Sequence, residues 1–257
     1  MIAAQLTSPM PEAGILRAWS EGRGRSDPDR AMAILVAALP EVPRASLESW
    51  SLGARDQLLL DLRSITFGDR VEAVAECPSC GERLEVVFDV TEIAGEESQP
   101  DEPGAARIQV EVTDGSAGYR VSLRPPTTAD LRLAAGAMDV GEGRRRLVDR
   151  CVLVAERDGS RIPSSELPDP VIEEMGRAVA ANDPRSDVRL AVSCPGCESR
   201  WEAPFDIAAF LWEEIRRYAR RLLGEVHTLA EAYGWTERDI LALPGSRRQA
   251  YLELVLG

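Results

Sequence analysis

Two copies of a short cysteine motif constrain the fold of this chain more than any other feature of its sequence. Residues 77–80 read Cys-Pro-Ser-Cys and residues 194–197 read Cys-Pro-Gly-Cys, an offset of 117 positions. The flanking residues repeat at the same offset, which predicts the same local structure twice: a strand, a tight turn and a second strand. The matching flanking pairs are Val71 and Val188, Arg83 and Arg200, Glu85 and Glu202, Phe88 and Phe205, and Asp89 and Asp206.

The spacing of these cysteines is typical of a structural metal site. Two thiolates that flank a two-residue turn can hold one face of a tetrahedral ion, and a structural zinc site takes four such ligands. Proline after the first cysteine fixes φ, and a small third residue lets the turn close. We therefore expect one Zn²⁺ bound by Cys77, Cys80, Cys194 and Cys197. Common zinc ribbons separate their pairs by only about 15–20 residues, so this ion would join two distant parts of the chain.

Two other uses of paired cysteines remain open. A thioredoxin-like redox motif has the same spacing but lies at a strand-to-helix turn, whereas strands are predicted on both sides of each pair here. A disulfide framework is disfavoured, because the sequence shows no signal peptide and is long enough to form its own core. The fifth cysteine, Cys151, begins an apolar run over residues 151–155 and is predicted to be a small buried hydrophobe.

The charge of the chain disfavours several classes of partner. Its 257 residues carry a net charge of −13, and all of the positive side-chain charge comes from arginine. General binding to nucleic acid or to an anionic membrane requires a basic field, so we expect neither. No stretch approaches the roughly 18 uninterrupted apolar residues of a membrane span. Reduced cysteines and the lack of an export signal indicate the bacterial cytoplasm.

The sequence offers little for catalysis. Its one histidine, His227, lies on a helical pattern with no nucleophile motif around it. There is no phosphate-binding Gly-x-x-x-x-Gly-Lys loop and no dinucleotide fingerprint. We therefore expect His227 to be a structural or surface residue and the protein not to be an enzyme.

The periodicity of apolar residues predicts an α+β fold. It is mostly helical, with two zinc-knuckle β-hairpins and one further hairpin over residues 108–123, clipped by the four-cysteine zinc site. The predicted helices cover residues 27–39, 54–64, 143–155 and 164–182, and a long helix begins at 207.

The same patterns divide the chain into three segments. Residues 1–26 are predicted to be a flexible N-terminal arm, and residues 27–206 a helical and zinc-knuckle core with an acidic linker at 94–106. Residues 207–257 form a C-terminal helical segment. Three aromatic residues of this segment belong to types common at interfaces: Trp212, Trp235 and Tyr251. For Trp212 and Trp235, the alternative is packing in the core.

A series of motifs, in a fixed order, carries a resemblance to a known family. They are Trp-Ser-Leu-Gly-Ala-Arg-Asp-Gln-Leu-Leu-Leu at 50–60, Thr-Phe-Gly at 66–68, Arg-Pro-Pro-Thr-Thr-Ala-Asp-Leu at 124–131, Tyr-Gly-Trp-Thr-Glu-Arg-Asp-Ile-Leu at 233–241 and Arg-Arg-Gln-Ala-Tyr at 247–251. Together with the two cysteine knuckles, this order resembles baseplate proteins of contractile-tailed phages and of phage-tail-like contractile injection systems, of the hub or hub-assembly type. The resemblance covers about residues 30–256.

The resemblance implies a non-enzymatic structural or assembly role beside other baseplate, spike or tube proteins, with the chain oligomeric within an assembly. An alternative is a zinc-ribbon adaptor in transcription or nucleic-acid binding, where Cys-Pro-x-Cys knuckles are common, although the acidic charge counts against it. A redox or metalloenzyme role is a third possibility. Four cysteines on one zinc would leave no open coordination position for such chemistry.

Overall fold

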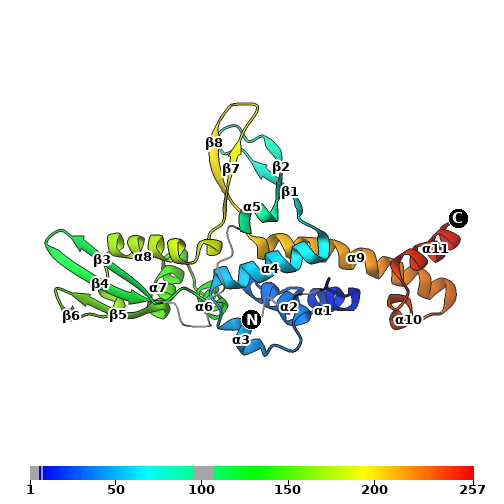
Figure 1. The fold of residues 1–257 in the computed structure, drawn as a ribbon, viewed down its shortest axis with the longest axis horizontal. Helices are drawn as coiled ribbons and strands as arrows, with labels where there is room; N and C mark the ends of the chain where they lie inside the picture. Colours follow the sequence, from blue (N-terminus) through cyan, green and yellow to red (C-terminus); the bar gives the residue numbers. More distant parts are fainter. Residues whose placement is uncertain (1–5, 7, 95–106) are drawn as a thin grey trace.

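The computed structural model describes residue 6, residues 8–94 and residues 107–257. They form an elongated molecule in which a central helical body carries three projections (Figure 1). One projection holds two β-hairpins, the second a four-stranded antiparallel sheet, and the third the C-terminal helices. The predicted fold class is confirmed: the chain is mostly helical with small antiparallel sheets, and four cysteines cluster.

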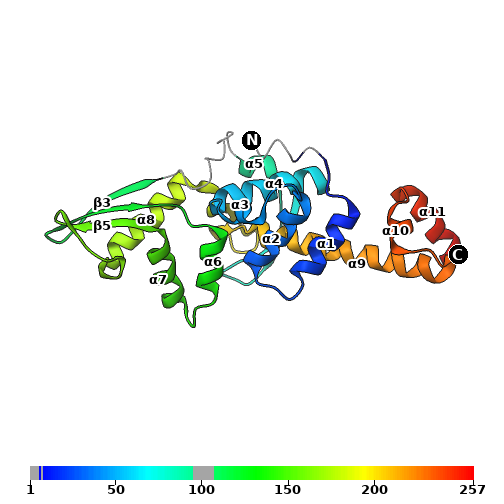
Figure 2. The same cartoon turned by 90° about the horizontal axis from the view of Figure 1, so that it is seen from below.

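The central body is built from four helices. They are α1 (Glu12–Gly22), α2 (Asp27–Ala38), α4 (Leu52–Phe67) and the first half of α9 (Ile207–Tyr233), which runs along the body (Figure 2). The short helix α3 (Arg44–Glu48) joins α2 to α4. Each helix turns an apolar stripe toward the others, and these stripes together make the main core. Its most deeply buried members include Ile15, Ile34, Leu35, Leu58, Leu59, Leu211, Ile215 and Leu222.

The N-terminal region departs from the prediction. The sequence predicts a flexible arm over residues 1–26, yet residues 12–22 form α1, which packs against α2 and α9. Ile15 and Ala18 of this helix are buried. The prediction gave too little weight to the apolar positions of α1, whose partners on α9 lie about two hundred residues away. Residues 1–5 and 7 lie outside the described part.

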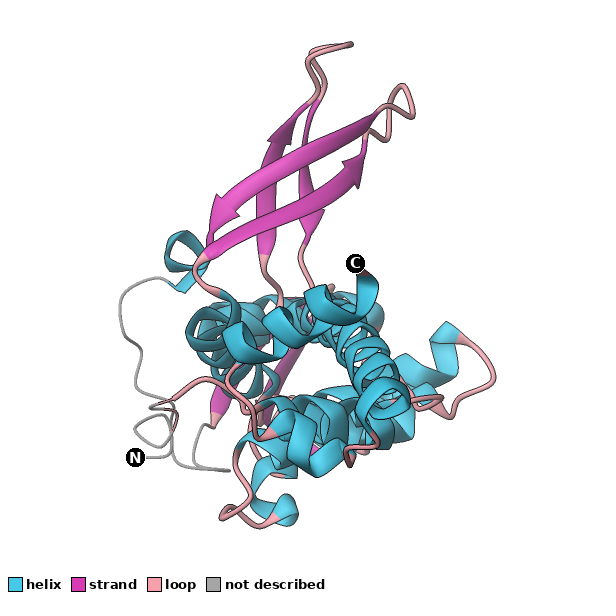
Figure 3. Cartoon of the chain, turned by 90° about the vertical axis from the view of Figure 1, so that its right-hand side faces the viewer, coloured by secondary structure: helices cyan, strands magenta, loops and turns pink. Residues whose placement is uncertain are grey.

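Two ribbons of two antiparallel strands stand side by side on the body (Figure 3). The first ribbon consists of β1 (Arg70–Glu76) and β2 (Arg83–Asp89), and the second of β7 (Arg189–Ser193) and β8 (Arg200–Pro204). Both hairpins lie where the sequence repeat predicts them. After β2 the chain enters α5 (Val90–Ala94). Apart from residue 94, the predicted acidic linker at 94–106 lies outside the described residues.

The second projection is a sheet covered by a helix. Its strands are β3 (Ile108–Asp114), β4 (Ala117–Leu123), β5 (Val152–Arg157) and β6 (Ser160–Arg161), in that order across the sheet. Helix α8 (Asp169–Asn182) packs on one face and closes a second apolar core. The predicted hairpin at 108–123 is therefore confirmed as β3 and β4, and two further strands extend it.

One of those strands was predicted as helix. The sequence pattern predicts a helix over residues 143–155, but α7 (Val140–Cys151) ends at Cys151 and β5 follows directly. Val152 and Val154 are β-branched and suit a strand. Pairing with β4, where Val121 lies opposite Ala155, decides between the two structures. The preceding helix α6 (Thr128–Ala135) begins with a capping box formed by Thr127 and Asp130.

The start of α8 also differs from the prediction. A helix was expected from residue 164, whereas residues Ser164–Glu166 form only a turn of 3₁₀ helix, and α8 begins at Asp169. Pro168 lies between them with extended backbone angles, φ −74° and ψ 156°, because the proline ring fixes φ at about −65°. A residue before proline is disfavoured in the helical region, which separates the two elements.

The third projection is formed where the chain folds back on the end of α9. Gly234 ends α9 with a left-handed φ of 69°, and α10 (Glu237–Leu241) and α11 (Gly245–Leu256) follow. Leu229, Ile240 and Leu252 form a small separate core. The predicted C-terminal segment at 207–257 is thus structurally divided, because the first half of α9 packs in the body. Among the described helices none is long and apolar enough to cross a membrane.

Candidate metal centre

The two cysteine motifs meet at the tips of the two ribbons. The four Sγ atoms of Cys77, Cys80, Cys194 and Cys197 all lie within 4.8 Å of one another. This set is named the four-cysteine cluster below. The shortest contacts cross between the ribbons: Cys77 Sγ lies 3.6 Å from Cys197 Sγ, and Cys80 Sγ lies 3.7 Å from Cys194 Sγ. In the repeat, Cys77 corresponds to Cys194 and Cys80 to Cys197. The two contacts are therefore equivalent, and the cluster has approximate two-fold symmetry.

Each motif folds into the same turn. In the first, the amide of Cys77 donates to Glu82 O (2.8 Å), and the amide of Gly81 donates to Cys77 O (2.8 Å). In the second, the amide of Cys194 donates to Ser199 O and the amide of Glu198 to Cys194 O, both at 2.9 Å. Each bond has its counterpart 117 residues later, so the sequence repeat is a structural repeat.

Packing between the ribbons fixes where the sulfur atoms lie. At the base, the rings of Phe88 and Phe205 meet edge to face, with centroids 5.1 Å apart. Higher up, Leu84 and Val192 are buried together with Cys77 and Cys194. The two phenylalanines, which occupy matching positions in the repeat, therefore hold the bases of the ribbons together. Side chains alternate between the two faces of a strand, and this alternation places the cysteines on the faces that the two ribbons turn toward each other.

The cysteines differ in exposure and in the groups around them. Cys77 and Cys194 are buried, whereas Cys80 and Cys197 are exposed. Burial would raise the pKa of the Cys77 thiol, but the amides of Cys80 and Ser79, which point at its sulfur, lower that pKa to about 7. Burial raises the pKa of Cys194 above its ordinary value. The turn amides therefore favour a thiolate at Cys77.

Sequence reasoning missed three polar groups beside the cluster. Ser79 Oγ and Ser199 Oγ are hydrogen-bonded at 2.9 Å across the two turns. The thiol of Cys194 donates to Glu82 Oε2 at 3.4 Å. Ser79 and Ser199 do not occupy matching positions in the repeat, since Ser79 corresponds to Gly196, so the repeat itself gave no signal for this contact.

The arrangement suits a tetrahedral ion better than the other uses of paired cysteines. Tetrahedral coordination with Zn–S bonds of about 2.3 Å places sulfur atoms about 3.8 Å apart, close to the two shortest contacts observed. All five cysteines are free thiols. Each Cys-x-x-Cys pair joins two antiparallel strands, not a strand and a helix as in the thioredoxin-like motif.

The remaining candidate residues lie elsewhere. Cys151 is buried at the end of α7, as predicted, and burial raises the pKa of its thiol to about 11. His227 lies on the surface of α9, with its side chain 80% exposed and Glu231 Oε2 3.7 Å away. Within the described ranges, the four-cysteine cluster is the one group of three or more histidine, cysteine, aspartate or glutamate side chains that lie close enough together to hold a metal ion.

Comparison with known proteins places the chain in a family. Residues 34–212 match the family described as T4 bacteriophage base plate protein. The match covers more than half of the chain and includes both ribbons, so the protein belongs to this family. The resemblance stated from the sequence motifs is confirmed at that level. Neither the curated proteins nor the solved structures include a significant match to the chain.

Proposed function

We propose that the protein is a non-enzymatic structural or assembly component, of the hub or hub-assembly type, in the baseplate of a contractile phage-tail-like particle. The observation that carries the proposal is the family match over residues 34–212, which includes α4 of the central body, the sheet projection and both cysteine motifs. The partners in this proposal are other baseplate, spike or tube proteins, with the chain oligomeric within the assembly. Assembly takes place in the cytoplasm, without nucleic acid as a ligand.

We further propose that the four-cysteine cluster binds one structural Zn²⁺. The donor set supports zinc, because four thiolates suit this ion and a cation offsets the charge of four thiolates held together. Four protein ligands complete a tetrahedral shell, so the ion would contribute rigidity and leave no position open for a substrate. When bound, the ion supplies a cross-link between the tips of the two ribbons.

A metal ion at the tips of the two ribbons would stabilise a part of the fold that has few other contacts. A ribbon of two strands is only marginally stable by itself. The buried apolar contacts between the ribbons near their tips involve few residues, chiefly Leu84 and Val192 besides the cysteines. Cross-links that close long loops restrict the unfolded chain most, and this one joins segments separated by more than a hundred residues. The ion would therefore hold the ribbons as one rigid projection.

The shape of the molecule supports a role in assembly. Three separate projections extend from one helical body, so different faces are available to different neighbours (Figure 1). Several large apolar side chains remain exposed on these projections. They include Val74 and Val87 on the first ribbon and Leu254 and Leu256 on α11. Outside the projections, Met138, which follows α6, and Val140, the first residue of α7, are exposed as well. Exposed apolar groups of this kind favour contact with other proteins.

The proposal is tested by deleting the gene in its host and examining tail-like particles by electron microscopy. We expect no complete particles in the deletion strain and restoration by the wild-type gene. Cys77→Ser should fail to restore particles, whereas Cys151→Ala, which removes a thiol outside the cluster, should restore them. Complete particles in the deletion strain would contradict a structural or assembly role.

A further inference from the structure

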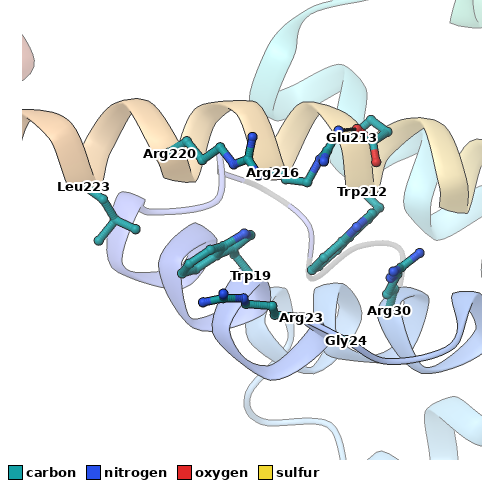
Figure 4. Close-up of a pocket in the computed structure, with 9 residues that line it drawn as sticks. All are labelled: Trp19, Arg23, Gly24, Arg30, Trp212, Glu213, Arg216, Arg220 and Leu223. Carbon is teal, nitrogen blue, oxygen red and sulfur yellow. Dashed lines mark hydrogen bonds and ion pairs between the residues drawn. The ribbon is translucent and has the colours of Figure 1, made fainter.

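A second candidate site lies between α9 and the two N-terminal helices. It is a pocket of about 450 Å³. Figure 4 shows its walls: Arg216 and Arg220 lie along α9, Trp212 projects from α9 toward α2, and Trp19 and Arg23 lie opposite on α1 and the loop after it. Arg30 of α2 completes the lining. These four arginines and two tryptophans are named the arginine pocket.

The aromatic walls of the arginine pocket are fixed in place. Trp212 is only 4% exposed, and a Cβ at Gly22 would lie 2.5 Å from its ring, so the chain passes this ring at van der Waals contact. The guanidinium carbon of Arg30 lies 5.2 Å from the Trp212 ring centroid, and that of Arg23 lies 5.5 Å from the Trp19 ring centroid. Stacking on an aromatic face orients a guanidinium group and leaves its edge free to donate hydrogen bonds.

The pocket concentrates positive charge in an acidic chain. It contains four arginines and one carboxylate, that of Glu213, although the whole chain carries a net charge of −13. Arg216 pairs with Glu213, and Arg30 pairs with Asp27 at 2.6 Å. Within the described part of the chain, Arg23 and Arg220 have no ion-pair partner. Two guanidinium groups are therefore available for an anionic ligand.

We propose that the arginine pocket binds an acidic segment of another protein, with carboxylates on the arginines and an apolar or aromatic side chain against Trp19. Carboxylates match the fork of a guanidinium group, which can bind them in bidentate fashion. An aromatic anchor beside arginine is typical of protein interface hot spots. This proposal rests on the proposed function, because an assembly protein requires specific sites for its neighbours.

A protein segment fits this site better than nucleic acid. Binding along a phosphate backbone needs a stripe of basic groups on a basic surface. Here the arginines converge on one concave site, and the surrounding chain is strongly acidic. The phosphates of a nucleic acid continue beyond the pocket and would be repelled by the acidic surface around it, whereas a short acidic segment can place its few carboxylates within the pocket.

The test measures binding of a fluorescein-labelled peptide to the purified full-length protein by fluorescence anisotropy. The probe is a short run of glutamates with one central phenylalanine. We expect saturable binding that weakens with added salt. The double variant Arg23→Glu/Arg220→Glu should lower the affinity by at least about tenfold, because two charge-assisted contacts become repulsive. The matched control Arg145→Glu/Arg177→Glu makes the same charge change at exposed positions of α7 and α8 and should bind like wild type.

Four outcomes would overturn the proposal. They are the absence of peptide binding, equal affinity in the two double variants, tighter binding of a labelled oligothymidine of similar length, and displacement of the peptide by an equal concentration of inorganic phosphate. Circular dichroism checks that all variants are folded. None of these outcomes bears on the deletion experiment, so failure of the pocket and failure of the proposed function can be told apart.

Discussion

At the scale of single residues, one buried carboxylate organises the junction between α6 and the sheet. The side chain of Asp130 is fully buried and accepts hydrogen bonds from Arg124 Nη1 (2.6 Å), Arg150 Nε (3.0 Å) and the amide of Thr127 (2.9 Å). Burial alone would raise the pKa of Asp130, but hydrogen bonds from Arg124, Thr127 and Arg150 hold it well below the usual range. The folded state therefore favours the charged form.

We predict that Asp130→Asn lowers the free energy of unfolding by about 2–4 kcal/mol at neutral pH, because Arg124 and Arg150 lose their charged partner. Since the folded-state pKa lies below the unfolded one, the charged carboxylate stabilises the fold at pH values above about 4, and this stabilisation is lost as the pH falls further. Urea unfolding of both proteins across this range measures the effect.

The difference between wild type and Asp130→Asn should therefore shrink as the pH falls below about 4. The matched control is Glu111→Gln, which breaks an ion pair with Arg120 on the same sheet in which both side chains are at least 63% exposed. It should change stability little. If the loss of unfolding free energy in Asp130→Asn stays the same at every pH, the charge of Asp130 is not what stabilises the fold.

At the scale of elements, the two turns at the ribbon tips both need a residue with a left-handed backbone conformation, and they use different residues there. Gly81 has φ 75°, and the residue at the matching position of the second turn, Glu198, has φ 58°. Left-handed backbone angles suit glycine but cost a residue with a side chain roughly 1–2 kcal/mol. The second turn is therefore the more strained of the two.

We predict that Glu198→Gly raises the free energy of unfolding by up to about 1 kcal/mol, because relief of strain outweighs the greater freedom of glycine in the unfolded chain. The reciprocal change, Gly81→Ala, should lower it by about the same amount. Chemical denaturation of the two variants under identical metal conditions provides the measurement. Equal effects of the same sign would show that the turns do not share this geometry.

The ribbons also show which elements the sequence could predict. Both hairpins and the four-cysteine cluster were predicted because the repeat supplies two independent observations of one pattern. The strand β5 was missed because its apolar run fits a helix or a strand locally, and only pairing of Ala155 with Val121 selects the strand. The packing of α1, which was predicted to lie in a flexible arm, was missed for a similar reason, because Ile15 and Ala18 are buried by helices distant in the sequence.

At the scale of the whole molecule, each projection is attached to the central body by a buried or half-buried polar contact. The sheet projection is attached through Asp183, whose carboxylate accepts from the amide of Gly53 at 2.9 Å. The first ribbon is attached through Arg63 of α4, which donates to Arg70 O at 2.6 Å and is itself held by an ion pair with Glu214 of α9 at 3.1 Å. The C-terminal helices are attached through the ion pair of Arg248 with Glu12 of α1 at 2.6 Å.

None of these long-range contacts, nor the arginine pocket, was predicted from the sequence. The pocket joins Trp19 to Trp212, and no local period or motif relates positions so far apart. The arginines of α9 could be assigned only to the side of the helix away from its apolar stripe. What lies opposite that side depends on how α1 and α2 pack, which is a property of the folded chain.

The central claim is that one zinc ion joins the two ribbons, and the metal content of the purified protein tests it most directly. Atomic absorption of wild type, Cys77→Ser, Cys194→Ser and the control Cys151→Ala separates a shared site from separate ones. We predict one zinc per chain in wild type and Cys151→Ala, and none in either cluster variant, because each ribbon supplies half of the ligands. Wild-type protein without zinc, or loss of metal in only one of the two cluster variants, would contradict the claim.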